Sequence, residues 1–354
     1  MGLDSCIYTL YNESAYIKEV TVRLFMSKPD PTIYDVAREA GVSIATVSRV
    51  LNFPHRVNAQ TRNTVINAIE KLGYIPKAES RARALMGTRR IGVLIPFFTE
   101  PSFVQRLRGI GSVLNKKDYE MVVYPVDSKE RSLSYLETLP IRKMLDGLII
   151  VSQVFDETIT KRLLDNRLET VTIEYYDFNF TSLMINDEKG GELATYYLFE
   201  KGYERIAFVG GQKNPVFGVD PITKRMNGYK KAILNKGLDL PEILINEYVY
   251  NHKQVLEKII ALGLPVAIFA ATDLQAIALI KEARLMGLRI PQDIAIIGFD
   301  NIDMAEFFGL TTVHQPLDES GRIAASLLIS RLSNPSQSTQ HIELPLKIIQ
   351  RETA

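Results

Sequence analysis

The chain has 354 residues, of which 46% are hydrophobic and 23% are charged, and its formal net charge is +1. This describes a soluble chain long enough for more than one domain, and its strand-length apolar runs exclude a membrane-spanning protein. The single cysteine, Cys6, excludes an internal disulfide framework, and the four scattered histidines show no metal-ligand spacing, so we expect neither a metal site nor a cofactor.

Residues 1–30 mix polar and aromatic side chains. They contain no basic segment followed by an apolar run, which is the pattern of a signal peptide. We therefore predict a disordered extension over residues 1–30, with Met26 as the candidate natural start.

The segment over residues 31–52, PTIYDVAREAGVSIATVSRVLN, predicts two short helices around a tight turn. Thr32 can cap the first helix, Gly41 suits the left-handed backbone at its end, and Ser43 can cap the second. The outward side of the second helix then carries small or polar groups and one arginine, which is typical of a recognition helix in a major groove. An ordinary helical hairpin is the alternative.

A third helix is predicted within VNAQTRNTVINAIEKLGYIP, over residues 57–76, where Val65 and Ile69 share one side and Gly73 and Pro76 end the helix. Three helices can close a small core. Residues 32–90 hold ten Lys or Arg against four Asp or Glu, a local charge of +6 that leaves −5 for the rest of the chain. Local positive charge favours phosphate binding, because each neutralised phosphate releases counterions.

These motifs, IYDVAREAGVSIATVSRVLN, VNAQTR and LGYIP, resemble the headpiece of the lactose/galactose/purine repressor family of bacterial transcription regulators. The resemblance continues more weakly through IGVLIP, GYERIAFVGG, KRMNGYKKAI, ATDLQAIAL, IPQDIAIIGFDN and LTTVHQPLDESGRIA, and so covers roughly residues 31–354. It implies a cytoplasmic, nucleoid-associated repressor whose affinity for operator DNA is controlled by a small-molecule effector. It implies no enzymatic activity.

The resemblance also implies how the headpiece contacts DNA. Ile44, Ala45 and Arg49 would read base edges in the major groove, with Arg49 on a guanine. A homodimer, or a tetramer, would present two headpieces to a pseudo-palindromic operator. The other expected DNA contacts, mainly to phosphates, are Thr32, Tyr34, Ser43, Thr46, Ser48, Asn52, Arg56, Asn58 and Thr61.

Residues 77–90 read as a linker that is rich in alanine and arginine and has little apolar surface to bury. In the family this position is a hinge helix that orders on DNA and inserts a leucine into the minor groove. The ARAL motif makes Leu85 that wedge, whereas counting from Pro76 puts Arg83 there. A flexible linker is the alternative.

From residue 91 onward, apolar runs alternate with amphipathic helical stretches. The runs expected as strands are IGVLIP, YEMVVYPVD, DGLIIVS, TVTIEY, RIAFVGG, EILINEYVY, VAIFAATD and DIAIIGFD. This alternation predicts an α/β fold with parallel sheets, and so many strands suggest two sheets. The resemblance implies two Rossmann-like lobes of the periplasmic-binding-protein type, joined by three crossovers. We expect one lobe over roughly 91–187 with part of 317–345, and the other over 188–316 with the C-terminus.

Ligand would bind at the carboxyl ends of the strands, between the lobes. The residues at the family's effector-binding positions are Phe103, Arg225, Tyr248, Thr272, Asp273 and Asp300. An aromatic face can cover a sugar ring, and arginine and aspartate can hold its hydroxyl groups, so a sugar-like effector is expected. Alternatively, the two aspartates cap helices, the aromatic residues belong to the core, and Arg225 lies on the surface. The family's usual aspartate and one of its aromatic residues are replaced by Phe97 and Ser102.

Two other classes of protein are weighed against this interpretation. The run RGIGSVLNK has Leu114 where a dinucleotide fingerprint needs a third glycine, and no P-loop, nucleophile elbow or HExxH motif occurs, so catalysis is not expected. A secreted sugar receptor would share the two-lobed core, but it would carry a signal peptide in place of a DNA-binding headpiece.

Overall fold

The computed structural model describes residues 31–74, 87–211, 218–239, 244–246 and 251–354. The chain divides into two compact units after Ala78, and each is described by itself. The predicted extension over residues 1–30 lies outside the described residues, as does most of the linker, including both candidate wedges, Arg83 and Leu85.

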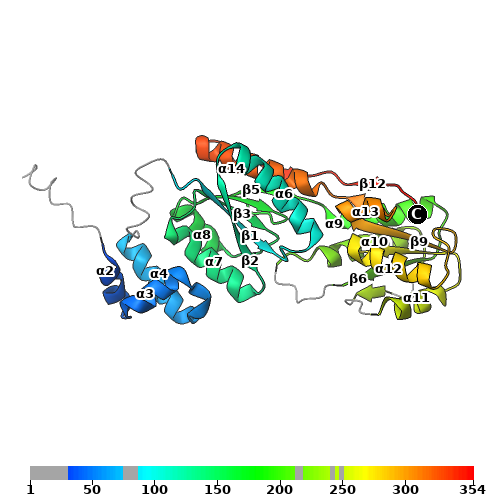
Figure 1. The fold of residues 1–354 in the computed structure, drawn as a ribbon, viewed down its shortest axis with the longest axis horizontal. Helices are drawn as coiled ribbons and strands as arrows, with labels where there is room; N and C mark the ends of the chain where they lie inside the picture. Colours follow the sequence, from blue (N-terminus) through cyan, green and yellow to red (C-terminus); the bar gives the residue numbers. More distant parts are fainter. Residues whose placement is uncertain (1–30, 75–86, 212–217, 240–243, 247–250) are drawn as a thin grey trace, which may run out of the picture. The chain divides into compact units, whose positions relative to one another are not determined.

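The first unit contains the three predicted helices, α2 (Ile33–Ala40), α3 (Ile44–Asn52) and α4 (Ala59–Leu72), with a short 3-10 turn, η1 (Pro54–Arg56), before α4 (Figure 1). The α2 cap depends on Asp35, whose carboxylate accepts from the Thr32 backbone N–H at 2.9 Å and hydroxyl at 2.7 Å. Gly41 follows α2 with φ of 64°, so the turn into α3 has the left-handed backbone expected there.

A small apolar core holds the three helices together. Val36 of α2, Val47 and Val50 of α3, and Val65 of α4 are all fully buried. Arg62 is also buried, and its guanidinium donates to the backbone carbonyl of Val57 at 3.2 Å, which ties α4 to the chain that precedes it. The outward side of α3 is therefore fixed by packing on its other side.

The second unit contains two six-stranded sheets (Figure 1). The first has the order β11-β5-β4-β3-β1-β2 and the second β12-β10-β9-β8-β6-β7. Neighbouring strands are parallel except for β10 and β12. The strands are β1 (Arg90–Pro96), β2 (Glu120–Val126), β3 (Gly147–Val151), β4 (Glu169–Ile173), β5 (Thr181–Met184), β6 (Ile206–Gly210), β7 (Leu244–Asn246), β8 (Val266–Ala270), β9 (Ile294–Asp300), β10 (Thr311–His314), β11 (His341–Glu343) and β12 (Lys347–Ile349).

All eight predicted strands are present, and of the apolar run that contains β7 the structure describes only residues 244–246. Four further strands, β5, β10, β11 and β12, were not predicted because each has only three or four residues and carries polar ones. They also show how the chain passes between the sheets. It leaves the first sheet after β5, returns after β10, and leaves again after β11, which confirms three crossovers between two lobes.

Helices cover both faces of each sheet. The first lobe has α6 (Pro101–Lys116), α7 (Lys129–Arg142), α8 (Glu157–Asp165) and α14 (Leu317–Ser333), and α14 packs along α6 (Figure 1). The second has α9 (Asp187–Glu200), α10 (Pro221–Asn235), α11 (His252–Ile260), α12 (Asp273–Leu285) and α13 (Asp303–Phe307). No helix among the described residues is long and apolar enough to cross a membrane.

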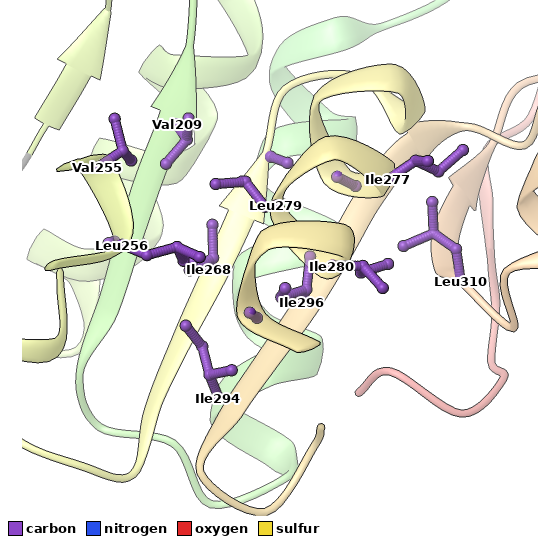
Figure 2. Packing of buried hydrophobic residues seen from close by; sticks show 14 of the residues in the cluster. Val209, Val255, Leu256, Ile268, Ile277, Leu279, Ile280, Ile294, Ile296 and Leu310 are labelled. Carbon is purple, nitrogen blue, oxygen red and sulfur yellow. The ribbon is translucent and has the colours of Figure 1, made fainter. Parts of the chain in front are cut away.

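Successive side chains along a strand point to opposite faces of the sheet, so each strand packs against helices on both faces. In β6, Val209 packs with the α11 and α12 side chains, whereas its neighbour Phe208 packs with α9 and α10. Figure 2 shows the first of these clusters, in which Leu279 and Ile280 of α12 lie over Ile268 and Ile296 of two adjacent strands. Because both faces are covered, the strands read as continuous apolar runs, and polar side chains are left to the loops at their ends.

Candidate functional site

A cavity of 360 Å³ lies between the two lobes of the second unit. Part of its polar lining comes from the residues just beyond the carboxyl ends of the strands, as expected for doubly wound sheets. Gln153 and Glu174 follow β3 and β4 in the first lobe, whereas Thr272 follows β8 and Asp300 ends β9 in the second. A ligand in this cavity would therefore contact both lobes.

One wall of the cavity is aromatic. Phe97 directly follows β1, Phe103 lies in the first turns of α6, and their ring centroids are 6.1 Å apart. The Arg106 guanidinium lies 5.5 Å from the centroid of the Phe103 ring, on the side of the buried charges. Phe103 therefore lies at the cavity, and Phe97 adds a second ring to the same wall.

A buried ion pair lies on the first-lobe side. The Glu174 carboxylate accepts from the Arg106 guanidinium and from the Ser152 hydroxyl. Arg106 also donates to the side-chain oxygen of Gln315 at 3.1 Å. Gln315, which follows β10, in turn donates to the Asp300 carboxylate, so one side chain joins the polar groups of the two lobes.

Arg225 of α10 is the centre of the second-lobe side. Its guanidinium donates to Asp187 at 2.9 Å and to the backbone carbonyl of Ala271 at 2.7 Å, and lies 3.3 Å from Asp300. The guanidinium carbon lies 3.7 Å from the centroid of the Phe299 ring. Arg225 is only 3% exposed, so the structure places it in the cavity wall and not on the outer surface.

Asp273 differs from the other described candidate effector residues, because it does not line the cavity. Its carboxylate accepts from the Thr312 hydroxyl at 2.6 Å and from the backbone N–H of Ile302 at 2.8 Å, and the residue is fully buried. It thus holds the loop after β9 in place. Thr272 does line the cavity, and its hydroxyl caps α12 by accepting from the backbone N–H of Gln275 at 3.3 Å.

These buried aspartates titrate abnormally. Burial raises the pKa of Asp187 to about 6 despite the nearby Arg225. Burial, reinforced by repulsion from Asp300, also raises the pKa of Asp273, and burial raises that of Asp300. As pH rises, these carboxyl groups therefore stay protonated in the folded core after the same groups in the unfolded chain have lost their protons.

We expect this proton binding to make the core less stable as pH rises. Because the folded pKa of Asp273 lies above its unfolded value, its contribution falls as pH rises from about 4 towards 8. Asp273→Asn does not titrate, and it can keep both contacts because its Oδ1 can accept from the Ile302 N–H while its NH₂ donates to the Thr312 hydroxyl. Over this range the wild type should lose on the order of 1 to 3 kcal/mol of unfolding free energy relative to the variant, measured by urea denaturation. A relative gain for the wild type would contradict the raised pKa.

Sequence reasoning missed several polar residues of the cavity. Ser152, Gln153, Glu174 and Gln315 directly follow or lie near the end of a strand, so the same rule that selected Thr272 and Asp300 could have found them. Arg106 and Gln275 lie instead on helices, where only the fold shows that they face the cavity. The missed residues are Glu100, Arg106, Ser152, Gln153, Glu174, His252, Gln275 and Gln315. Tyr248, which was predicted here, lies outside the described residues.

A separate ion-pair cluster links the lobes beside the cavity. Arg108 of α6 donates to Asp303 of α13 at 2.6 Å and to Asp318 of α14 at 2.6 Å. Next to it, Gln105 accepts from the Asp303 backbone N–H at 3.0 Å. Since α6 belongs to the first lobe and α13 to the second, these contacts fix the spacing of the lobes in this conformation.

The headpiece residues predicted to meet DNA lie on an accessible surface of the first unit. Tyr34, Ile44, Ala45 and Arg49 are exposed, and within the described residues the Arg49 guanidinium has no partner. Several others have local roles. Ser43 and Asn58 accept from the backbone N–H groups of Thr46 and Thr61, Asn52 donates to Ser48, and the Arg56 guanidinium lies over the Phe53 ring. Thr32 is bound to Asp35 as described above.

No group of three or more possible metal ligands occurs in the described part of the chain. The absence of a metal site stays a prediction from the sequence.

Comparison with known proteins identifies both units. Residues 32–77 match the model of bacterial regulatory proteins of the lacI family, and residues 195–354 match that of the periplasmic binding protein-like domain. The ribose operon repressor of Escherichia coli strain K12 is 32% identical over 334 residues, which cover 91% of this chain and 99% of the repressor.

Solved structures agree. A complex of the transcriptional regulator CelR with cellobiose is 27% identical, with a TM-score of 0.62, over 92% of this chain and 100% of that one. A LacI-family regulator from Enterococcus faecium with bound ribose is 27% identical, with a TM-score of 0.64, over 75% of this chain and 98% of that one.

Along the chain, a helix-turn-helix headpiece is followed by two parallel-sheet lobes with a cavity between the lobes. This combination defines a DNA-binding transcription regulator with a ligand-binding core. The extent of the similarity identifies it further: the chain belongs to the lacI family of bacterial regulatory proteins.

Proposed function

We propose that this regulator represses transcription from a pseudo-palindromic operator, and that a sugar-like effector in the cavity between the lobes sets its affinity for that site. The observation that carries the proposal is the cavity itself, since ligand there must contact residues of both lobes. Support also comes from the relatives, whose printed names and titles refer to ribose and cellobiose. The protein would act in the cytoplasm, on the nucleoid.

On the DNA side, we assign base reading to Ile44, Ala45 and Arg49, and phosphate contacts to the remaining predicted headpiece residues. One headpiece can contact only a few base pairs, so specificity requires a homodimer. The core would supply the dimer contact, and the exposed apolar side chains of Met304 and Phe307 on α13 support this. Leu85, or Arg83 in the other register, would enter the minor groove.

On the effector side, Phe97 and Phe103 would cover the apolar face of the ligand, and Arg225, Thr272 and Asp300 would line its polar side. Asp273 would act as a positioning residue through the loop after β9, because its carboxylate is taken up by Thr312 and Ile302. Effector binding would change the angle between the lobes and so the affinity for DNA, with a coupling typically of about 1 to 3 kcal/mol.

The experiment is selection of bound duplexes from random DNA, with and without a panel of free sugars. We expect two symmetric half-sites, and we expect at least one sugar to change operator affinity by roughly 5- to 150-fold. Binding should weaken with added salt, as phosphate contacts require. Retention of all duplexes alike would refute a sequence-specific regulator, whereas indifference to every sugar would refute only the effector assignment.

A further inference from the structure

The charged groups of the cavity are already paired with each other. Arg106 is bound to Glu174 and Gln315, and Arg225 to Asp187, Asp300 and a backbone carbonyl. The described lining residues include no lysine. A ligand phosphate or carboxylate would therefore find neither arginine free to neutralise it.

Acidic groups also outnumber basic ones around the cavity. Glu100, Glu174 and Asp300 line it against two arginines, and Asp187 lies buried behind the second-lobe wall. His252 adds no compensating charge, because burial lowers the pKa of its imidazole and leaves it neutral near pH 7. An anionic ligand would enter a partly dry site of like charge, which is strongly unfavourable.

Within the described residues, the buried side-chain atoms of the cavity lining that have no hydrogen-bond partner are two acceptors and one donor. Gln153 and Gln275 are 1% and 8% exposed, and within the described residues the side-chain oxygen of each has no partner. Their orientations are set, because each side-chain NH₂ donates to a backbone carbonyl, that of Ser152 at 3.1 Å and that of Gly211 at 2.9 Å. The two oxygens are thus fixed acceptors, one from each lobe.

Buried acceptors without a partner are costly, so a ligand that donates to them gains affinity. Hydroxyl groups can donate to both, and a hydroxyl or ring oxygen can accept from the Arg106 Nε, which is also unpartnered within the described residues. An unmodified sugar offers such donors and acceptors together. A phosphate at physiological pH offers acceptors only.

We propose that the effector is a polyol without an anionic group, bound by hydroxyl donation to Gln153 and Gln275, and that the cavity rejects phosphorylated and carboxylated sugars. This rests on the proposed function, in which a sugar-like effector occupies this cavity. Because the two glutamines belong to different lobes, the same hydroxyl contacts would hold the lobes at one angle.

The test is isothermal titration calorimetry on the full-length protein at pH 7.5 with matched pairs: ribose, glucose, galactose and fructose, each beside its phosphate ester. We expect at least one free sugar to bind and its ester to bind at least 100-fold more weakly. An ester that binds more tightly than its parent would overturn this inference and leave the sugar effector standing. If no compound binds, the effector assignment itself fails and this inference fails with it.

Two sets of variants test separately the hydroxyl contacts to the glutamines and the rejection of anionic ligands. Gln153→Leu and Gln275→Leu remove an acceptor at nearly constant volume, and each should weaken binding of the free sugar at least tenfold. Glu100→Gln should lower the ratio of the Kd of the phosphate ester to the Kd of the free sugar at least threefold. Glu204→Gln, at an exposed acid that does not line the cavity, should leave that ratio as it is. Equal ratios in both glutamate variants, or unchanged sugar binding in both leucine variants, would overturn the proposal.

Discussion

Arg225→Met should lower the unfolding free energy of the core by about 3 to 5 kcal/mol, the usual cost of removing one partner of a buried ion pair. Methionine keeps the volume of the aliphatic stem, so the loss would come from the charge and from the hydrogen bond to the Ala271 carbonyl. Asp187 and Asp300 would remain buried without the cation that now lies 2.9 Å and 3.3 Å from them. Urea denaturation followed by circular dichroism measures the change.

Arg108→Met is the matched control, because it removes the same group from two carboxylates that lie nearer to solvent. The Arg108 side chain is 52% exposed, against 4% for Arg225, so its loss should cost less than about 1 kcal/mol. The deficit of Arg225→Met should also shrink as pH falls towards 5, since protonation would neutralise the two stranded aspartates. If Arg225→Met loses less than 1 kcal/mol of unfolding free energy at pH 7.5, Arg225 does not balance the charges of Asp187 and Asp300.

Much of the fold was predictable from the sequence because its signals are local. The helices of the headpiece follow from caps and apolar spacing, and the eight predicted strands follow from apolar runs such as IGVLIP, which is buried on both faces. The short strands were not predictable in this way. The β10 segment, TTVH, acquires its strand conformation from pairing with two other strands, β9 before it in the chain and β12 after it. That pairing cannot be read from the segment itself.

The candidate site was predictable only in part, for a related reason. Arg225 and Asp300 stand at recognisable positions, and the structure places both in the cavity wall. The residues that surround Arg225 and Asp300 and set their charge states could not be predicted from the sequence. Arg106 and Gln315 are 209 positions apart and meet only because α6 and the segment after β10 lie at the same end of the sheets. Asp273, at an equally recognisable position, turns away from the cavity to hold Ile302.

Arg49→Ala should weaken binding to the selected operator by about 1 to 3 kcal/mol, roughly 5- to 150-fold, and should remove base preference at one position in each half-site. Arg49 lies on the exposed side of α3, and within the described residues its guanidinium is free to make two hydrogen bonds to a guanine. The buried side of α3 stays intact, so the headpiece should remain folded. Fluorescence anisotropy on a set of single-base operator variants measures both effects.

Arg38→Ala is the control for a general loss of positive charge. Arg38 is an exposed arginine on α2 that is paired with Asp35, so its removal should weaken binding to all duplexes by a similar, smaller factor. Base readout predicts that Arg49→Ala flattens the preference at one position and leaves the others intact. If Arg49→Ala instead weakens every duplex equally, as Arg38→Ala is expected to, then Arg49 contacts phosphate, and discrimination between operators must come from Ile44, Ala45 and the bending of the DNA.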